Sequence, residues 1–154
     1  MSPKSLLRHP LCVSDAKDIE TGTNFQELLD DPAVTTAAQT KKVKRVLYCT
    51  GKVYYDLLQK KNEDKRDDVA IVRLEQLYPF PLTQMEKMKK KYKNAEAFWV
   101  QEESSNMGAW QLFLAFYQDF SIKLISRRSS ASPASGFKKV SDQQQQDLVA
   151  EAFK

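Results

Sequence analysis

The chain has 154 residues, of which 42% are hydrophobic, 29% charged and 10% aromatic, and its formal net charge is +4. This composition excludes wholesale disorder, and four glycines and six prolines exclude a collagen-like or low-complexity chain. No apolar run approaches the roughly 20 residues that span a bilayer, and the N-terminal residues lack the apolar core of a signal peptide. We therefore expect one soluble globular domain with a core of its own and no membrane partner.

Residues 1–42 are predicted to form an irregular lead-in arm, a linker whose apolar residues pack on the domain that follows. Prolines at positions 3, 10 and 32 interrupt any long helix, and Asp30-Asp31-Pro32 is typical of a turn. One short element is expected between Phe25 and Leu29, and residues 35–42 resemble an exposed loop.

Residues 43–154 alternate between two hydrophobic periods and define the predicted domain. Short apolar runs predict four strands, at residues 43–49, 69–74, 95–100 and 122–125. Stretches with helical periodicity predict helices from Lys52, from Leu82 and from residues 106–108, and Ser141 is the predicted N-cap of a last helix. Strands that alternate with helices of about ten residues are typical of βαβ units, so the predicted fold class is α/β with a mostly parallel sheet.

Two of these helices have distinctive surfaces. The helix after Leu82 carries a run of lysines that can attract nucleic acid or another polyanion. The run has only Tyr92 to stack on bases, so we interpret it as a solvated face and expect no nucleic-acid partner. The helix at residues 110–117 is apolar on most sides, which predicts that it is buried. The lysines of the run are Lys87, Lys89, Lys90, Lys91 and Lys93.

The sequence offers few groups for catalysis or metal binding. His9 is the single histidine, and it lies on the irregular arm, where a surface position is its usual role. Cys12 and Cys49 lack CxxC spacing, which argues against zinc and indicates a reducing compartment. The nucleophile elbow, the dinucleotide fingerprint and the P-loop are all missing. We therefore predict no catalytic residue and no metal ligand, and a binding or assembly domain rather than a self-contained enzyme.

Three places have residue types that suit a ligand. The turn from Cys49 to Lys52 ends a predicted strand and opens a helix, where backbone N–H groups favour an anion, although a plain turn with an exposed lysine is the alternative. Arg127 and Arg128 head a serine-rich loop that suits phosphate or carboxylate, or else a salt bridge at the rim. Residues 102 and 103 are both glutamates at the carboxyl end of a strand, and they should point to opposite faces.

Five stretches run in order across nearly the whole chain and carry a family resemblance. They are residues 1–10, 47–57, 70–81, 99–103 with Asn106, Gly108, Ala109 and Trp110, and 127–136. Together they resemble the C-terminal domain of the thiamine-diphosphate-dependent decarboxylating component of the 2-oxoglutarate dehydrogenase complex, in the transketolase C-terminal-like family. The resemblance implies three layers, with a mostly parallel five-stranded sheet flanked by helices.

The family also implies a function for the complete enzyme. That enzyme is a homodimer dependent on thiamine diphosphate and magnesium, an oxidoreductase of the tricarboxylic acid cycle that oxidatively decarboxylates 2-oxoglutarate. It passes the succinyl group to the lipoyl arm of a partner acyltransferase. The family's cofactor motif, Gly-Asp-Gly followed by Asn-Asn, lies in preceding domains and is missing here. The resemblance therefore predicts a fragment that is inactive alone and that completes the subunit, extends the dimer contact and shapes the entry to the active site.

Some relatives respond to an effector such as acetyl-CoA or AMP, bound near this domain. The cations here that suit its phosphates are Lys4, Arg8, Lys52, Arg127 and Arg128, with Arg128 and Lys52 as first choices. Two other interpretations stay open, a stand-alone nucleotide- or anion-binding α/β module and the equivalent domain of a 2-oxoadipate dehydrogenase. The expected location is a bacterial cytoplasm or, in a eukaryote, the mitochondrial matrix.

Overall fold

A five-stranded sheet forms the centre of the structure. The computed structural model describes residues 3–119 and 121–154, and its strands are β1 (Leu28–Leu29), β2 (Arg45–Cys49), β3 (Val69–Leu74), β4 (Glu96–Ser104) and β5 (Lys123–Arg127). Their order in the sheet is β1-β3-β2-β4-β5. β1 is antiparallel to β3, and all other neighbours are parallel. The predicted α/β fold with a mostly parallel five-stranded sheet is confirmed.

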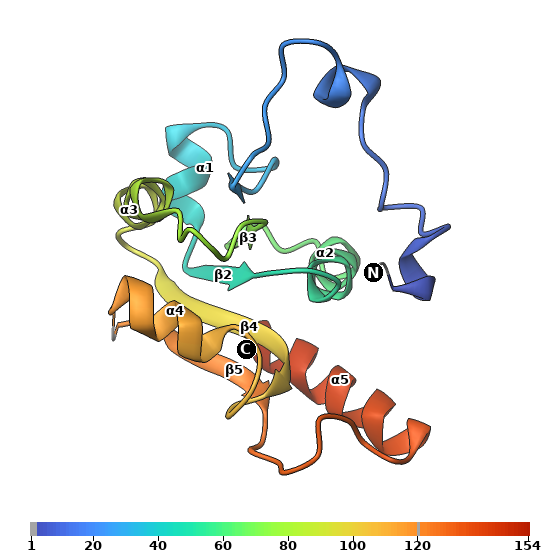
Figure 1. Ribbon diagram of the computed structural model, residues 1–154. Helices are drawn as coiled ribbons and strands as arrows, with labels where there is room; N and C mark the ends of the chain where they lie inside the picture. Colours follow the sequence, from blue (N-terminus) through green and yellow to red (C-terminus); the bar gives the residue numbers. More distant parts are fainter. Residues whose placement is uncertain (1–2, 120) are drawn as a thin grey trace.

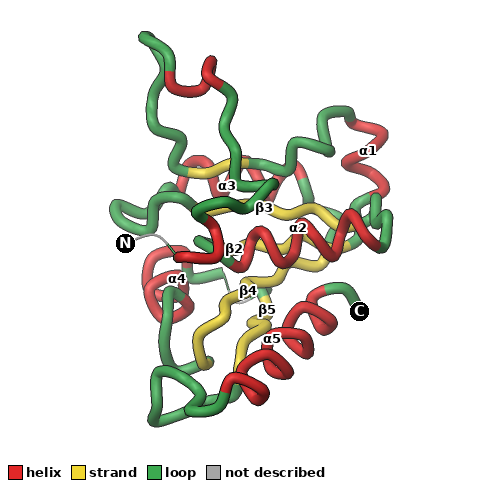
Figure 2. Tube along the Cα trace, turned by 90° about the vertical axis from the view of Figure 1, so that its right-hand side faces the viewer, coloured by secondary structure: helices red, strands yellow, loops and turns green. Residues whose placement is uncertain are grey.

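Helices cover both faces of the sheet and give three layers (Figure 1). α2 (Val53–Glu63) and α5 (Lys138–Ala152) pack on one face, and α3 (Leu82–Lys91) and α4 (Trp110–Tyr117) pack on the other (Figure 2). The alternation of apolar side chains along β2 explains this arrangement. Val46 and Tyr48 belong to the cluster under α3 and α4, whereas Leu47 and Cys49 belong to the cluster under α2 and α5.

Three local predictions were wrong. Residues 35–42 are mostly exposed, but most of them form a helix, α1 (Ala37–Lys42), because Thr36 and Gln39 make a capping box at its start. α5 begins at Lys138 after Phe137, without a side-chain cap, so Ser141 lies inside the helix rather than at its N-cap. α4 is only half covered, since Phe113 and Tyr117 are buried whereas Phe116 is 44% exposed.

The N-terminal residues extend away from the sheet before they join it. Short 3₁₀ turns form at Lys4–Leu6 and Ala16–Ile19. The chain between the first of these turns and β1 loops outward (Figures 1 and 2). Val13 and Ile19 are each 80% exposed on this loop. At β1 the chain then supplies the fifth strand, with Leu28 opposite Leu74.

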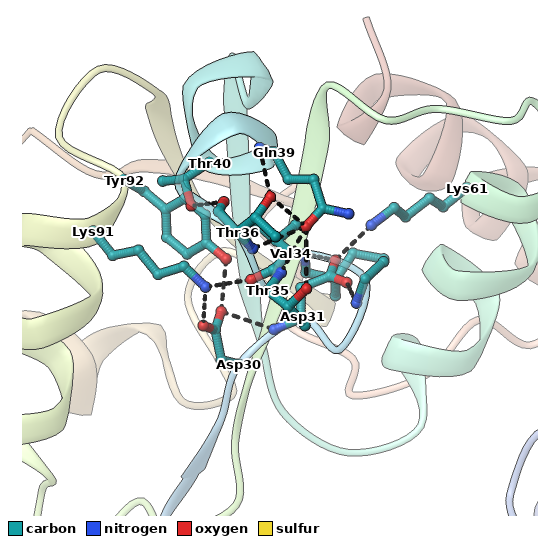
Figure 3. A network of polar contacts seen from close by, with 12 residues as sticks. Asp30, Asp31, Val34, Thr35, Thr36, Gln39, Thr40, Lys61, Lys91 and Tyr92 are labelled. Atoms are coloured by element: carbon teal, nitrogen blue, oxygen red, sulfur yellow. Dashed lines mark hydrogen bonds and ion pairs between the residues drawn. The ribbon is translucent and has the colours of Figure 1, made fainter.

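Two consecutive aspartates tie the end of this segment to the domain (Figure 3). Asp31 is buried, and its Oδ2 accepts hydrogen bonds from the Lys61 ammonium at 2.6 Å and from the Ile71 N–H at 2.8 Å. Asp30 accepts from the Lys91 ammonium and from the Tyr92 hydroxyl. The stretch predicted only as a turn therefore anchors the chain to α2, β3 and α3.

The lysine run of α3 is mostly a solvated face. Lys87, Lys90 and Lys93 are exposed, whereas Lys89 pairs with Asp119 at 2.8 Å and Lys91 is held by Asp30. Among the described residues, no helix is both long and apolar enough to cross a bilayer.

Candidate functional site

The carboxyl ends of β2 and β4 mark the place where the connections of the sheet change direction. β2 leads through α2, on one face, to β3, and β3 leads through α3, on the other face, to β4 beyond β2. Open α/β sheets bind ligands outside the carboxyl ends of strands at such a switch point. β2 ends at Cys49, and the turn that follows contains Gly51 with a φ of +70°, so it reverses tightly into α2.

An ion-pair cluster occupies this switch point. The Lys52 ammonium lies 2.6 Å from Oε1 of Glu102, on β4, and 3.4 Å from Oδ2 of Asp56, in the first turn of α2. Burial by itself lowers the pKa of Lys52, but its hydrogen bonds and charge interactions with Glu102 and Asp56 outweigh that effect, so its pKa is raised above the usual value. Lys52 is therefore a charged residue with two acidic partners, in place of the free cation that the sequence left open.

A pocket of about 670 Å³ opens beside this cluster, between the ends of β4 and β5, the serine-rich loop and α5. Its lining is polar, with hydroxyl groups, two guanidinium groups and three carboxylates. The lining residues are Glu102, Ser104, 126–130, 132–135, Gln144, Asp147, Leu148 and Glu151. Both predicted arginines, Arg127 and Arg128, thus face one cavity, and Glu102 joins that cavity to the switch point.

The two arginines differ in their surroundings. Arg128 is exposed and has no hydrogen-bond or ion-pair partner within residues 3–119 and 121–154. Arg127 is partly buried, and its Nη2 donates to Oε1 of Gln145 at 3.1 Å. The Nε of Arg127 is buried without an acceptor among the described residues. The exposed Arg128 guanidinium therefore keeps hydrogen-bonding capacity that an oxyanion in the pocket can use, whereas the Nε of Arg127 is buried.

A continuous polar network links the pocket to the ion-pair cluster. Gln145, on α5, accepts from Arg127 and donates to Oδ2 of Asp56 at 2.8 Å. Asp56 pairs with Lys52, and Lys52 pairs with Glu102. The arginine of β5 and the lysine of the β2–α2 turn are thus held by one set of side chains.

The serine-rich loop is fastened over the pocket at two points. The Asn106 amide makes two hydrogen bonds with the backbone of Ser130, one to its carbonyl oxygen at 2.9 Å and one from its N–H at 3.1 Å. The Ser135 hydroxyl lies 3.2 Å from Oε1 of Gln144 and donates to it. Asn106 therefore holds the loop in place from the turn that follows β4.

Buried Gln101 shapes that turn, a role that the sequence analysis missed. Its Oε1 accepts from the Trp99 indole and the Trp110 N–H, each at 3.0 Å, and its Nε2 donates to the carbonyls of Ser104 and Met107. Gly108 is packed against it, with φ at +71°. The available signal was a glutamine directly after the apolar run of residues 97–100, and the glycine of the following turn was the second.

The remaining predicted cations lie elsewhere. Lys4 and Arg8 are exposed on the N-terminal segment, and neither lines the pocket. His9 contacts the ring of Tyr55, with 5.5 Å between ring centroids. Glu103 is exposed and points away from Glu102, as the strand alternation predicts.

The side chains of this site do not fit thiamine diphosphate with its magnesium ion. The carboxylate nearest the switch point, that of Glu102, already forms an ion pair with Lys52. Across the described ranges, no group of three or more His, Cys, Asp or Glu side chains is arranged to hold a metal.

The fold and the site define an α/β domain with a polar, ligand-sized pocket at the carboxyl edge of its sheet. Residues 13–153 match the family described as 2-oxoglutarate dehydrogenase C-terminal. The chain therefore belongs to that family, as its sequence resemblance predicted.

Individual relatives agree with the family match. The chain is 43% identical over 160 residues to a multifunctional 2-oxoglutarate metabolism enzyme of Mycobacterium sp. (strain JLS). This alignment covers 99% of this chain and 13% of the relative. It is 41% identical over 159 residues to the mitochondrial 2-oxoglutarate dehydrogenase of Caenorhabditis elegans, covering 99% of this chain and 15% of the relative. The chain thus spans about one seventh of the length of these relatives.

Proposed function

We propose that this chain is the C-terminal domain of the decarboxylating component of a 2-oxoglutarate dehydrogenase. In the complete protein this component oxidatively decarboxylates 2-oxoglutarate and transfers the succinyl group to the lipoyl group of a partner acyltransferase. The observation that carries the proposal is the family match over residues 13–153. Thiamine diphosphate and magnesium are bound by the preceding domains, and the protein works in a bacterial cytoplasm or a mitochondrial matrix.

The domain serves assembly rather than chemistry. It completes the subunit, extends the contact of the homodimer and shapes the entry to the active site. An apolar surface beside α4 supports this role, since Tyr78, Leu82 and Phe116 are 73%, 49% and 44% exposed. Tyr78 and Phe116 lie together, with 5.9 Å between their ring centroids. Contiguous exposed aromatic surface is typical of a face that another domain covers.

The experiment compares this chain with the full-length protein. Decarboxylation of 2-oxoglutarate is measured for both with thiamine diphosphate and magnesium present, and 2-oxoadipate is the second substrate. We expect turnover only from the full-length protein. Turnover by the 154 residues alone would contradict the proposed role, and a preference of the full-length protein for 2-oxoadipate would transfer the proposal to that class of dehydrogenase.

The domain also binds a regulatory anion, such as a phosphate group of acetyl-CoA or AMP, in the pocket below the serine-rich loop. Arg128 is the primary ligand because it is exposed in the pocket without a partner among the described residues, and Arg127 supports it. The other three candidate cations do not line the pocket: Lys52 is paired with Glu102, and Lys4 and Arg8 lie on the N-terminal segment. The same pocket would serve a stand-alone anion-binding module, which is the second candidate function.

Titration of acetyl-CoA and AMP tests this part of the proposal. Arg128→Ala should weaken binding at least about tenfold, the value of one charge-assisted hydrogen bond. Arg8→Ala is the matched control, and it should leave binding unchanged. Weak, salt-insensitive binding that is equal in wild type and Arg128→Ala would overturn the site. Micromolar binding by the chain alone, without any preceding domain, would favour the stand-alone module.

A further inference from the structure

Glu102 belongs to two sites at once. Its side chain lines the pocket, and its Oε1 lies 2.6 Å from the Lys52 ammonium. Lys52 itself does not line the pocket, so its ammonium lies one ion-pair distance behind the wall that Glu102 forms. Both side chains are partly exposed, at 31% and 25%, so the pair is not sealed from solvent.

The charges of the lining make this position important. Two guanidinium groups face three carboxylates, those of Glu102, Asp147 and Glu151, so the pocket has a formal charge of −1. An anion entering such a pocket meets repulsion as well as the two arginines. If the Glu102 carboxylate withdraws and the Lys52 ammonium takes its place in the wall, the formal charge becomes +1.

We propose that Lys52 is a latent ligand of this pocket, and that an oxyanion with two separated charges, of the diphosphate class, gains it by displacing the Glu102 carboxylate. The proposal rests on the anion binding proposed above. One end of the ligand contacts Arg128, and the other replaces Glu102 on Lys52. Asp56 remains on Lys52 at 3.4 Å and keeps the ammonium oriented during the exchange. Gln145 bridges Asp56 and Arg127, so the network that holds Lys52 also holds the pocket's second guanidinium group.

Inorganic diphosphate is the probe, and isothermal titration of the full-length protein and of this chain is the measurement. Glu102→Gln removes the competing carboxylate, and it should tighten binding about tenfold, because Lys52 becomes available for one charge-assisted hydrogen bond. Glu151→Gln is the matched control, since it removes the same charge from the same lining without touching Lys52. It should tighten binding by less than about threefold, which is the share expected of simple charge.

The double variant Lys52→Met with Glu102→Gln separates exchange from charge. If diphosphate replaces Glu102 on Lys52, the gain in diphosphate affinity that Glu102→Gln produces must disappear in the double variant. Equal gains for Glu102→Gln and Glu151→Gln, or a gain that survives in the double variant, would overturn the exchange while the anion site stands. Binding that does not depend on Arg128 would overturn the anion site itself.

A measurement on the wild-type protein does not depend on how the variants fold. Saturating diphosphate should shift the NMR signal of the Lys52 ammonium, whereas the Lys60 ammonium, paired with Asp64 at 3.0 Å outside the pocket, should stay in place. An unmoved Lys52 signal at saturation would overturn the proposal.

Discussion

The ammonium of Lys61 lies 2.6 Å from Oδ2 of Asp31, and both side chains are less than a tenth exposed. The same oxygen accepts the N–H of Ile71 in β3, and Oδ1 accepts the N–H of Ala33. One carboxylate therefore accepts hydrogen bonds from a lysine of α2, from a backbone N–H of β3 and from a backbone N–H of its own turn. This contact fixes the segment that supplies β1.

Asp31→Asn should destabilise the fold strongly, because it leaves the Lys61 charge buried without its partner. Breaking a buried pair in this way costs about 3–5 kcal/mol. Urea denaturation of wild type and variant measures the difference. Asp67→Asn is the control, since the Asp67–Lys42 pair is 3.0 Å long but mostly exposed, and it should cost less than about 1 kcal/mol. Similar losses from the two variants would refute the importance of burial at Asp31.

Gly108 closes the turn between β4 and α4 under two constraints. Its φ is +71°, and a Cβ there would lie 3.0 Å from both amide atoms of Gln101 and from Cβ of Glu103. Gly108→Ala should therefore lower the free energy of unfolding by about 1–3 kcal/mol. Gly136→Ala is the control, because nothing lies within 4 Å of its Cβ and its φ is not in the left-handed region. Thermal melts should show a lower transition temperature for Gly108→Ala alone. An unchanged transition temperature would show that the Gln101 side chain moves to make room for the added methyl group.

The sequence predicted the elements whose signal is local. Strands β2, β3 and β4 stand out because each has a continuous apolar run, and the arginines at 127 and 128 share a pocket because they are adjacent in the chain. β1 has only two residues, and its pairing depends on Asp30 and Asp31, whose lysine partners are 61 and 30 residues away, respectively. No periodicity reports contacts at that distance.

The same limit applies to the candidate site. Lys52 and Glu102 meet only because β2 and β4 are neighbours, and the order of parallel strands is decided by crossovers that leave no pattern in the residues. The start of α5 was misplaced for a related reason. Phe137 precedes the helix without a side-chain cap, so the serine at 141 was the stronger local signal.

Alkaline pH should unfold the protein through groups buried in the sheet. Burial raises the pKa of the Cys49 thiol from 9.0 to about 12, with Arg73 opposing that shift, and burial raises the pKa of Tyr48 well above 10.0. The unfolded chain therefore loses these protons first, so their contribution to stability is complete below about pH 9 and decreases as the pH rises towards about 12.

Urea midpoints measured from about pH 8 to about pH 11 check this linkage. Stability should fall over that range, and the absorbance of tyrosinate from Tyr48 should appear only with unfolding. Cys49→Ala should lower stability at neutral pH but give a shallower alkaline decline than wild type. An equal decline in both proteins would assign the pH dependence to other groups.

The Asn106 side chain fastens the serine-rich loop to the turn that follows β4. Asn106 makes both of its hydrogen bonds with the backbone of Ser130 at the surface. Asn106→Ala should therefore free the loop without unfolding the domain, since exposed hydrogen bonds contribute about 1 kcal/mol each. Trypsin, which cuts after Arg127 and Arg128, should cleave the variant several times faster than wild type, because a freed segment opens at little cost.

Asn62→Ala, at an exposed position of α2, should leave the cleavage rate unchanged. Equal rates for Asn106→Ala and wild type would mean that the Ser135–Gln144 contact holds the loop alone, and that the pocket keeps its shape without the β4–α4 turn.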